Sequence, residues 1–244
     1  MAYLGRRVDR KRPPGCRVID SLEAESTRFA DNLTDLIQGC LRDAPEFVVV
    51  DASDNQQRRI GPSPFESGFA FIPLLRKCDG NGPPRLMLKV EFHVSLDRQQ
   101  DHLAVQRSTF GLWVQPDVQR SPRPVFRIEY DRDASNKPSA HIHLHAESVE
   151  LGWIYGTAGL PLPRLQEIHF PVGGRRFRPT VEELLEFLHR EQLFTDWSPG
   201  WRPRLDESLS DWNRRQARAT VRNDPKAAIE QLESMGYEVM SVHS

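Results

Sequence analysis

Three histidines alternate with small or apolar residues in the stretch AHIHLHA, residues 140–146. On a β-strand successive side chains point to opposite faces, so His141, His143 and His145 would share one face of a sheet. Imidazole titrates near neutral pH, and its unprotonated nitrogen binds metal ions. Such a face is suited to acid–base catalysis or metal coordination. The alternative without chemistry is a solvated strand face that carries imidazoles.

A carboxylate is expected opposite these histidines on the preceding strand. Paired residues must point to the same face, which allows two registers. In one register Glu129 lies opposite His141, and Arg127 lies opposite His143. In the other, Glu129 lies opposite His143. Asp131 then faces His141. Directly opposed Cβ atoms are about 4.5–5.5 Å apart, so a carboxylate contacts a histidine in either register.

The face can be used with or without a metal ion. Alternate residues are about 6.6 Å apart along a strand, so two neighbouring imidazoles can converge on one ion but all three cannot. A divalent metal, if bound, would be held by His141 and His143, or by His143 and His145. The third ligand would be Glu129, Asp131 or His93. Without metal, one imidazole would act as base and another as acid. We favour the metal-free version because Arg127 would repel a cation. His141, His143, His145 and Glu129 are the candidate catalytic residues.

A second cluster lies in the stretch PVGGRRFRPT, residues 171–180. Two glycines give a flexible turn, three arginines follow, and a helix is predicted to begin directly afterwards. Helix N-termini and arginine forks attract phosphate. The candidate phosphate-binding residues are Arg127, Arg175, Arg176 and Arg178. The alternative is that these arginines pair with glutamates of the following helix.

A third stretch, residues 197–215, interleaves three tryptophans with four arginines. This pattern can bind single-stranded nucleic acid by stacking and phosphate contact. More often such tryptophans attach a loop to the core, and this is the interpretation we favour.

The elements that must position these residues follow from hydrophobic periodicity. Helices are predicted at 21–42, 181–192, 206–221 and 225–236, the second with a capping box of Thr180 and Glu183. Strands are predicted at 47–51, 69–75, 86–95, 105–115, 125–131 and 140–147, with a loop at 52–64. Short connections without helices favour antiparallel pairing. The fold class is therefore α+β: an antiparallel β-sheet meander with an N-terminal helix and a helical C-terminal part.

The chain divides into a basic N-terminal arm (1–19), an α+β core domain (20–194) and a helical C-terminal segment (195–244). The last of these either packs on the core or forms a separate subdomain. No apolar run is long enough to span a membrane, and the first residues lack the apolar stretch of a signal peptide. We therefore expect a cytoplasmic protein without membrane contact. Its three widely spaced cysteines suggest reduced thiols rather than a disulfide framework.

The stretch HIHLH resembles the signature of the histidine-triad nucleotide hydrolases. Here Ala146 and Glu147 follow the histidines and a strand precedes them, unlike that family, so we do not adopt it. The segment from His141 through GGRRFRP is similar to uncharacterised actinobacterial proteins, some associated with toxin–antitoxin systems. That resemblance implies an RNase-like toxin.

Together these patterns predict an enzyme that acts on a phosphodiester or nucleotide, such as an RNase-like toxin. Its partner would be RNA or a nucleotide, and the cofactor, a divalent metal or none, stays open. The alternative is a non-catalytic module that binds a partner protein or nucleic acid through the polar sheet face and the arginines. His–carboxylate pairs favour the enzyme, and dispersed histidines favour the module.

Overall fold

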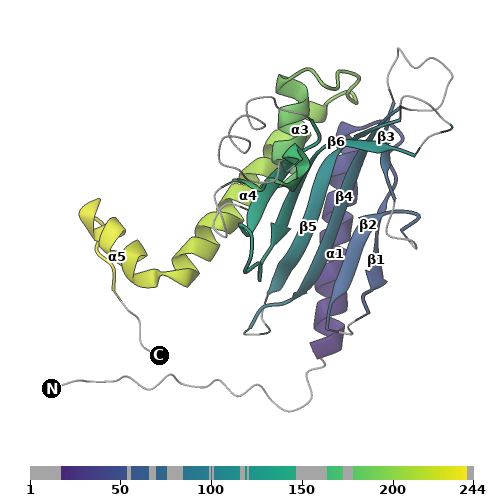
Figure 1. The fold of residues 1–244 in the computed structure, drawn as a ribbon. Coiled ribbons are helices and arrows are strands. Elements are labelled where there is room, and N and C mark those ends of the chain that lie inside the picture. Colours follow the sequence, from purple (N-terminus) through teal and green to yellow (C-terminus); the bar gives the residue numbers. More distant parts are fainter. Residues whose placement is uncertain are drawn as a thin grey trace, which may run out of the picture.

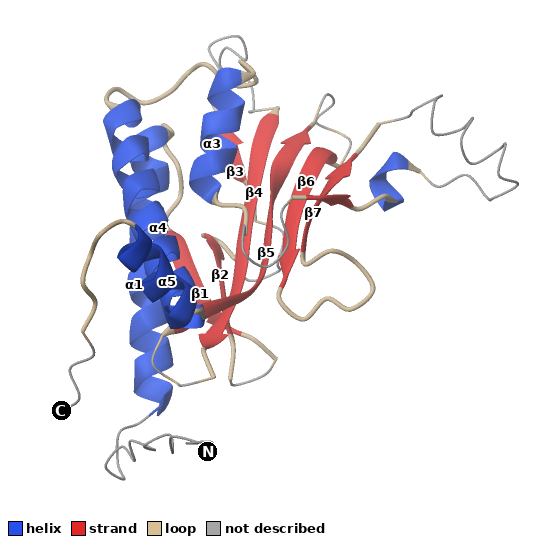
Figure 2. Ribbon diagram, turned by 90° about the vertical axis from the view of Figure 1, so that its left-hand side faces the viewer, coloured by secondary structure: helices blue, strands red, loops and turns tan. Residues whose placement is uncertain are grey.

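The computed structural model describes residues 18–53, 56–65, 70–75, 85–98, 100, 102–115, 119, 121–146, 164–172 and 178–240. It has two layers, an antiparallel β-sheet with the long helices along one side (Figures 1 and 2). The helices are α1 (Val18–Cys40), η2 (Leu165–Glu167, a short 3₁₀ helix), α3 (Val181–Arg190), α4 (Trp201–Asn223) and α5 (Pro225–Ser234). The predicted α+β class is confirmed.

The strands are β1 (Phe47–Asp51), β2 (Arg58–Pro62), β3 (Ile72–Leu74), β4 (Leu86–Leu96), β5 (Leu103–Val114), β6 (Arg123–Asp131), β7 (Ala140–Leu144) and β8 (Phe170–Pro171). Within the described residues they form one eight-stranded sheet in the order β1-β2-β4-β5-β6-β7-β8. The short β3 pairs with β4 beside Leu86–Leu88, on a part of that strand that β2 does not reach. Each of these pairs is antiparallel.

One face of the sheet is apolar because alternate residues of β4, β5 and β6 are large hydrophobic side chains. Helix α1 packs its own apolar stripe on this face, where Phe29 meets Phe92 edge-on with ring centroids 4.9 Å apart. Helix α3 adds Leu184, Leu185 and Leu188, all buried in the same core. The helices therefore leave the opposite face, which carries the histidines, for polar side chains.

The helix boundaries follow the predicted caps. Thr180 Oγ1 accepts a hydrogen bond from Glu183 N at 3.0 Å, and Glu183 Oε2 accepts one from Thr180 N at 3.0 Å. Asp224 caps α5 by accepting from Ala227 N at 3.1 Å, and Pro225 follows at the first helical position. These local signals confirm the predicted starts of α3 and α5.

The interpretation of the tryptophans as core contacts is confirmed for two of them. Trp197 is buried in the core, donates a hydrogen bond to Phe194 O at 3.0 Å and stacks on Trp201 at 4.4 Å between ring centroids. Leu205, in the first half of α4, belongs to the same core. The start of the C-terminal segment thus packs on the core.

Two predicted elements were wrong in extent. The predicted loop at 52–64 contains β2, which pairs with β1 on one side and with β4 on the other and so joins β1 to the rest of the sheet. Helix α4 starts at Trp201 rather than 206, because Pro203 lies in its first turn, where no backbone donor is needed. Of the helices in the described part of the chain, none combines the length and the apolar character needed to cross a membrane.

Candidate metal centre

The pairing of β6 with β7 decides between the two registers. Glu129 lies opposite His141, and Arg127 lies opposite His143. Both pairs are on the face of the sheet away from the long helices. The first of the two predicted registers is therefore confirmed.

The histidine face is not solvated as a plain polar strand face would be. His141 has no exposed surface and His143 is 6% exposed. Buried imidazoles need partners, and each has a backbone carbonyl: His141 Nδ1 is 2.8 Å from Pro138 O, and His143 Nδ1 is 2.6 Å from Gln166 O. A carbonyl oxygen only accepts, so Nδ1 of both rings carries the hydrogen, and in the neutral imidazole Nε2 carries the lone pair.

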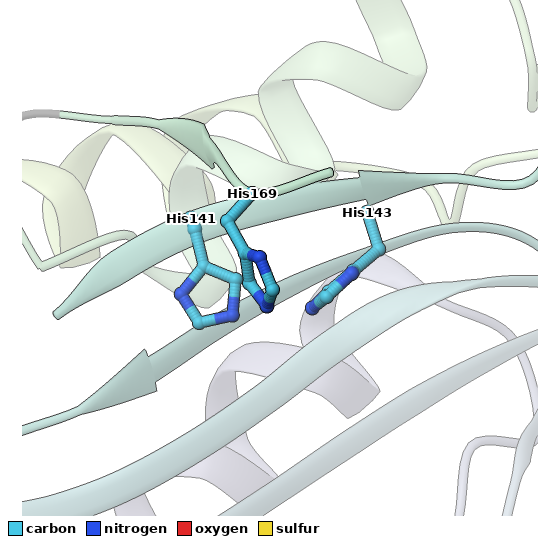
Figure 3. A group of neighbouring side chains, drawn as sticks. All are labelled: His141, His143 and His169. Atoms are coloured by element: carbon cyan, nitrogen blue, oxygen red, sulfur yellow. The ribbon is translucent and has the colours of Figure 1, made fainter. Parts of the chain in front are cut away.

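A third histidine, His169, completes the cluster from the segment just before β8. This strand pairs with β7 at only two positions, which brings His169 next to the other two rings (Figure 3). Its ring centroid is 4.8 Å from that of His141 and 4.9 Å from that of His143. One ring nitrogen from each of the three residues lies within 4.8 Å of the others.

Glu129 adds a carboxylate to this cluster. Its Oε2 atom is 3.6 Å from His141 Nε2 and 3.5 Å from His143 Nε2. The Nε2 atom of His141 is buried and makes no hydrogen bond. Burial lowers the pKa of His141 and of His169, which favours their neutral forms. Lone pairs of the neutral His141 and His169 rings thus lie close to a carboxylate oxygen, an arrangement that a cation stabilises.

The orientation of the rings is the one that metal ligands adopt. Histidines that bind metal usually donate their second ring nitrogen to a carbonyl or carboxylate, which fixes the tautomer and the ring plane. In tetrahedral zinc sites the Zn–N distance is about 2.0–2.1 Å, so ligand nitrogens are roughly 3.4 Å apart. The three ring nitrogens lie within 4.8 Å of one another, so they would approach by up to about 1.4 Å to reach this spacing.

The structure does not bring His145 into the cluster. This residue directly follows the end of β7. Its pKa is lowered mainly by burial and secondly by the positive charge of Arg127. His169 lies where a third ligand was expected from the sequence, for which Glu129, Asp131 and His93 were the candidates. The clue available was another histidine beside an apolar run, HFPV, but a two-residue strand gives no periodic signal.

Two cations lie beside the cluster and pair with the same carboxylate. Arg127 Nη1 is 3.2 Å from Glu129 Oε1, and Lys137 Nζ is 3.8 Å from Glu129 Oε2. The charge of Arg127 is therefore opposed by Glu129, which weakens the expected repulsion of a metal ion.

The predicted arginine turn does not join the histidines as one site in the described residues. Arg175 and Arg176 lie outside the described residues. The Arg178 guanidinium lies 4.6 Å from the ring centroid of Trp212 of α4, on the helical side of the sheet. Burial lowers the pKa of Arg178 to about 10. The sheet thus separates Arg178 from the histidine cluster, beside which it was expected to bind phosphate.

A second carboxylate network lies on the same face, one strand pair away. Glu91 Oε1 accepts from Arg59 Nη2 at 3.0 Å and from His93 Nε2 at 3.2 Å, and Lys89 Nζ is 3.3 Å from its other oxygen. Burial alone would raise the pKa of Glu91. The hydrogen bond from His93, with Lys89 and Arg59, outweighs burial and lowers the pKa to about 2.

This network predicts a specific acid sensitivity. The pKa of Glu91 is lower in the folded chain than in the unfolded chain. The ionised Glu91 side chain therefore stabilises the fold fully above pH 4.5, and this stabilisation is lost as the pH falls toward 2. The loss amounts to about 3 kcal/mol of unfolding free energy. We expect the Glu91→Gln variant to lose less unfolding free energy between pH 6 and pH 3 than the wild type does, as measured by urea unfolding at both pH values. Glu207→Gln, at an exposed ion pair with Arg204, is the control and should keep the wild-type loss.

An open cleft of about 860 Å³ continues the polar face beyond Glu91 and Glu129. Asp131, two residues after Glu129 on β6, lines it together with Arg59, His93 and Arg107. Glutamines, serines, Asp133 and a few apolar residues such as Leu96 complete the lining. The cleft therefore offers hydrogen-bond donors and acceptors and charges of both signs, and it reaches β6 at Asp131, two residues beyond Glu129.

The chain matches no protein-family model, and no curated protein or solved structure is significantly similar to it. The functional argument therefore depends on the site.

Proposed function

We propose that this protein is a metal-dependent hydrolase of phosphodiesters or nucleotides. A divalent transition-metal ion, of the kind that imidazoles prefer, would be bound by His141, His143 and His169. The observation that carries the proposal is the convergence of these three rings within 4.8 Å, with two of them oriented by backbone carbonyls. Three protein ligands with room for water are typical of catalytic rather than structural zinc sites.

The surrounding residues suit the hydrolysis of an anionic substrate. A bound metal lowers the pKa of its water to about 7 and so supplies hydroxide at neutral pH. Glu129, whose Oε2 faces both His141 and His143, would accept the proton of that water. Arg127 and Lys137 are unfavourable neighbours for a metal alone, but they suit a site in which phosphate oxygens join the metal.

The metal-free mechanism that we favoured from the sequence has less support. We favoured it because Arg127 would repel a cation. The pairing of Arg127 with Glu129 weakens that repulsion, and His169 adds a third imidazole to the cluster. The cleft that begins at Asp131 provides space for the rest of a nucleotide or an RNA strand.

Metal analysis and turnover on the same sample test the proposal. The purified full chain should contain about one transition-metal ion per chain by elemental analysis, and should hydrolyse bis(p-nitrophenyl) phosphate or single-stranded RNA. Chelation should abolish this activity, and added zinc or manganese should restore it. Glu129→Gln should keep the metal and lose turnover.

Three results would contradict parts of the proposal. Turnover that survives complete removal of metal would return the histidines to metal-free acid–base chemistry. Stoichiometric metal without turnover on any phosphodiester would contradict the hydrolase. Absence of metal binding in the folded protein would remove the metal centre itself.

A further inference from the structure

The C-terminal arm, defined here as residues 209–240, has an uncovered apolar surface. Ten large hydrophobic side chains are exposed in the described residues, and six of them lie in the arm: Val221, Ile229, Leu232, Met235, Tyr237 and Met240. Soluble monomers rarely gather exposed apolar side chains in one place, and such patches mark interaction sites.

The arm extends away from the body of the protein (Figure 1). In α4 the single buried residue is Leu205, before the arm begins, and α5 has no buried residue. Within the arm, Trp212 contacts the Arg178 guanidinium, 4.6 Å from its ring centroid, but no arm residue is buried. Helices with so little tertiary packing are marginally stable in water. A helical arm of this kind therefore needs a partner that covers it.

The charges of the arm are segregated between its two helices. The last part of α4 carries the exposed residues Arg214, Arg215, Arg218 and Arg222, with no acidic residue between Asp211 and Asp224. From α5 onward the balance is acidic, with Glu230, Glu233 and Glu238 against Lys226. In the described part of the chain, the ion pairs of these residues stay within one helix: Arg214 with Asp211, and Lys226 with Glu230.

We propose that a second copy of this chain covers the arm in a two-fold symmetric dimer, with α4 of one copy beside α5 of the other. A two-fold interface uses the same surface twice, so each basic half meets an acidic half. The interface buries three apolar side chains of each copy: Val221 of α4, and Ile229 and Leu232 of α5. A polyanion matches only the arginines and leaves the apolar side chains exposed beside the glutamates.

The apolar part of the interface is tested by light scattering of the full chain after size exclusion. The wild type should have twice the mass of one chain. Ile229→Asp with Leu232→Asp should halve that mass, because two charges would be buried in the interface. Leu193→Asp, at a comparably exposed apolar residue outside the arm, is the control and should stay dimeric.

Charge reversal tests the arrangement of the two helices. Arg218→Glu with Arg222→Glu should give a monomer, and so should Glu230→Arg with Glu233→Arg. Mixed in equal amounts, the two variants should form a heterodimer, because each basic helix again faces an acidic one. All these variants should bind metal as the wild type does, since the histidine cluster lies on another part of the fold.

A wild-type chain that stays monomeric at high concentration would overturn the dimer. So would two reversal variants that stay monomeric when mixed. If the chain is monomeric and Arg218→Glu with Arg222→Glu instead loses affinity for a single-stranded oligonucleotide, the arm binds a polyanion and the dimer is wrong.

Discussion

Replacing His143 with alanine should abolish metal binding and phosphodiester turnover. One of three converging ring nitrogens is lost, and with it the ring that pairs with Glu129 Oε2 at 3.5 Å. Loss of an outer partner of a metal ligand already costs about 10–100-fold in affinity, so loss of a ligand should cost more than about 100-fold. Calorimetric zinc titration of the apo-protein, with turnover on the same sample, measures this.

The stability of the His143→Ala variant should change measurably. The residue lies off the core face of the sheet, where a substitution ordinarily costs little stability. The ring is buried, however, and its removal leaves Gln166 O without its donor, which costs about 1–3 kcal/mol. The variant should still fold, as near-ultraviolet circular dichroism would show.

His145→Ala is the matched control from the same triplet. The structure leaves His145 outside the cluster, so this variant should keep its metal and its turnover. If His145→Ala fails as His143→Ala does, or if His143→Ala retains stoichiometric zinc, the cluster of His141, His143 and His169 is not the metal centre.

Gly111→Ala should strongly destabilise the fold. A Cβ atom at this position would lie 2.4 Å from Phe126 O and 2.7 Å from Trp113 Cζ3. The carbonyl is part of the β5–β6 pairing, so it cannot move without disturbing the ladder that also carries Arg127 opposite Gly111. Overpacking of this kind costs about 1–3 kcal/mol and occasionally more, and contact with backbone puts this case at about 3 kcal/mol or above. Chemical denaturation gives the value.

Gly39→Ala provides the comparison. Its added Cβ would be 2.8 Å from Arg204 Cγ, the middle of a flexible, half-exposed side chain that can turn away. Gly39 is in the last turn of α1, where alanine is favoured over glycine by less than about 1 kcal/mol, the value for a helix interior. The unfolding free energy should therefore change little. Equal destabilisation of the two variants would contradict the tight β5–β6 contact.

The elements that the sequence predicted well are those with local signals. The capping box of Thr180 and Glu183 sits beside a regular apolar stripe, and both are readable within one turn of helix. The register of β6 on β7 was narrowed to two choices because a shift by one residue would turn every apolar side chain outward.

The parts that were missed depend on contacts distant in the chain. The segment RRIGP contains a glycine and a proline, a composition typical of a loop. In the structure it is β2, which pairs with β1 on one side and with β4 on the other. His169 reaches His141 only because β8 returns to the edge of β7 from a long connection. The burial of Glu91 and His143 on the polar face likewise depends on the whole sheet, so no local sequence pattern indicates it.

Because β8 pairs with β7 at only two positions, a metal ion in the proposed centre would also help to hold β8 on the sheet. Two residue pairs and the hydrogen bond from Val172 N to Ala140 O, at 3.2 Å, hold this strand at the sheet edge. Edge segments with so few contacts open locally, at a small fraction of the free energy of global unfolding. An ion that joins His169 to the two histidines of β7 would fasten the edge, so opening of β8 and release of the ion would become one event.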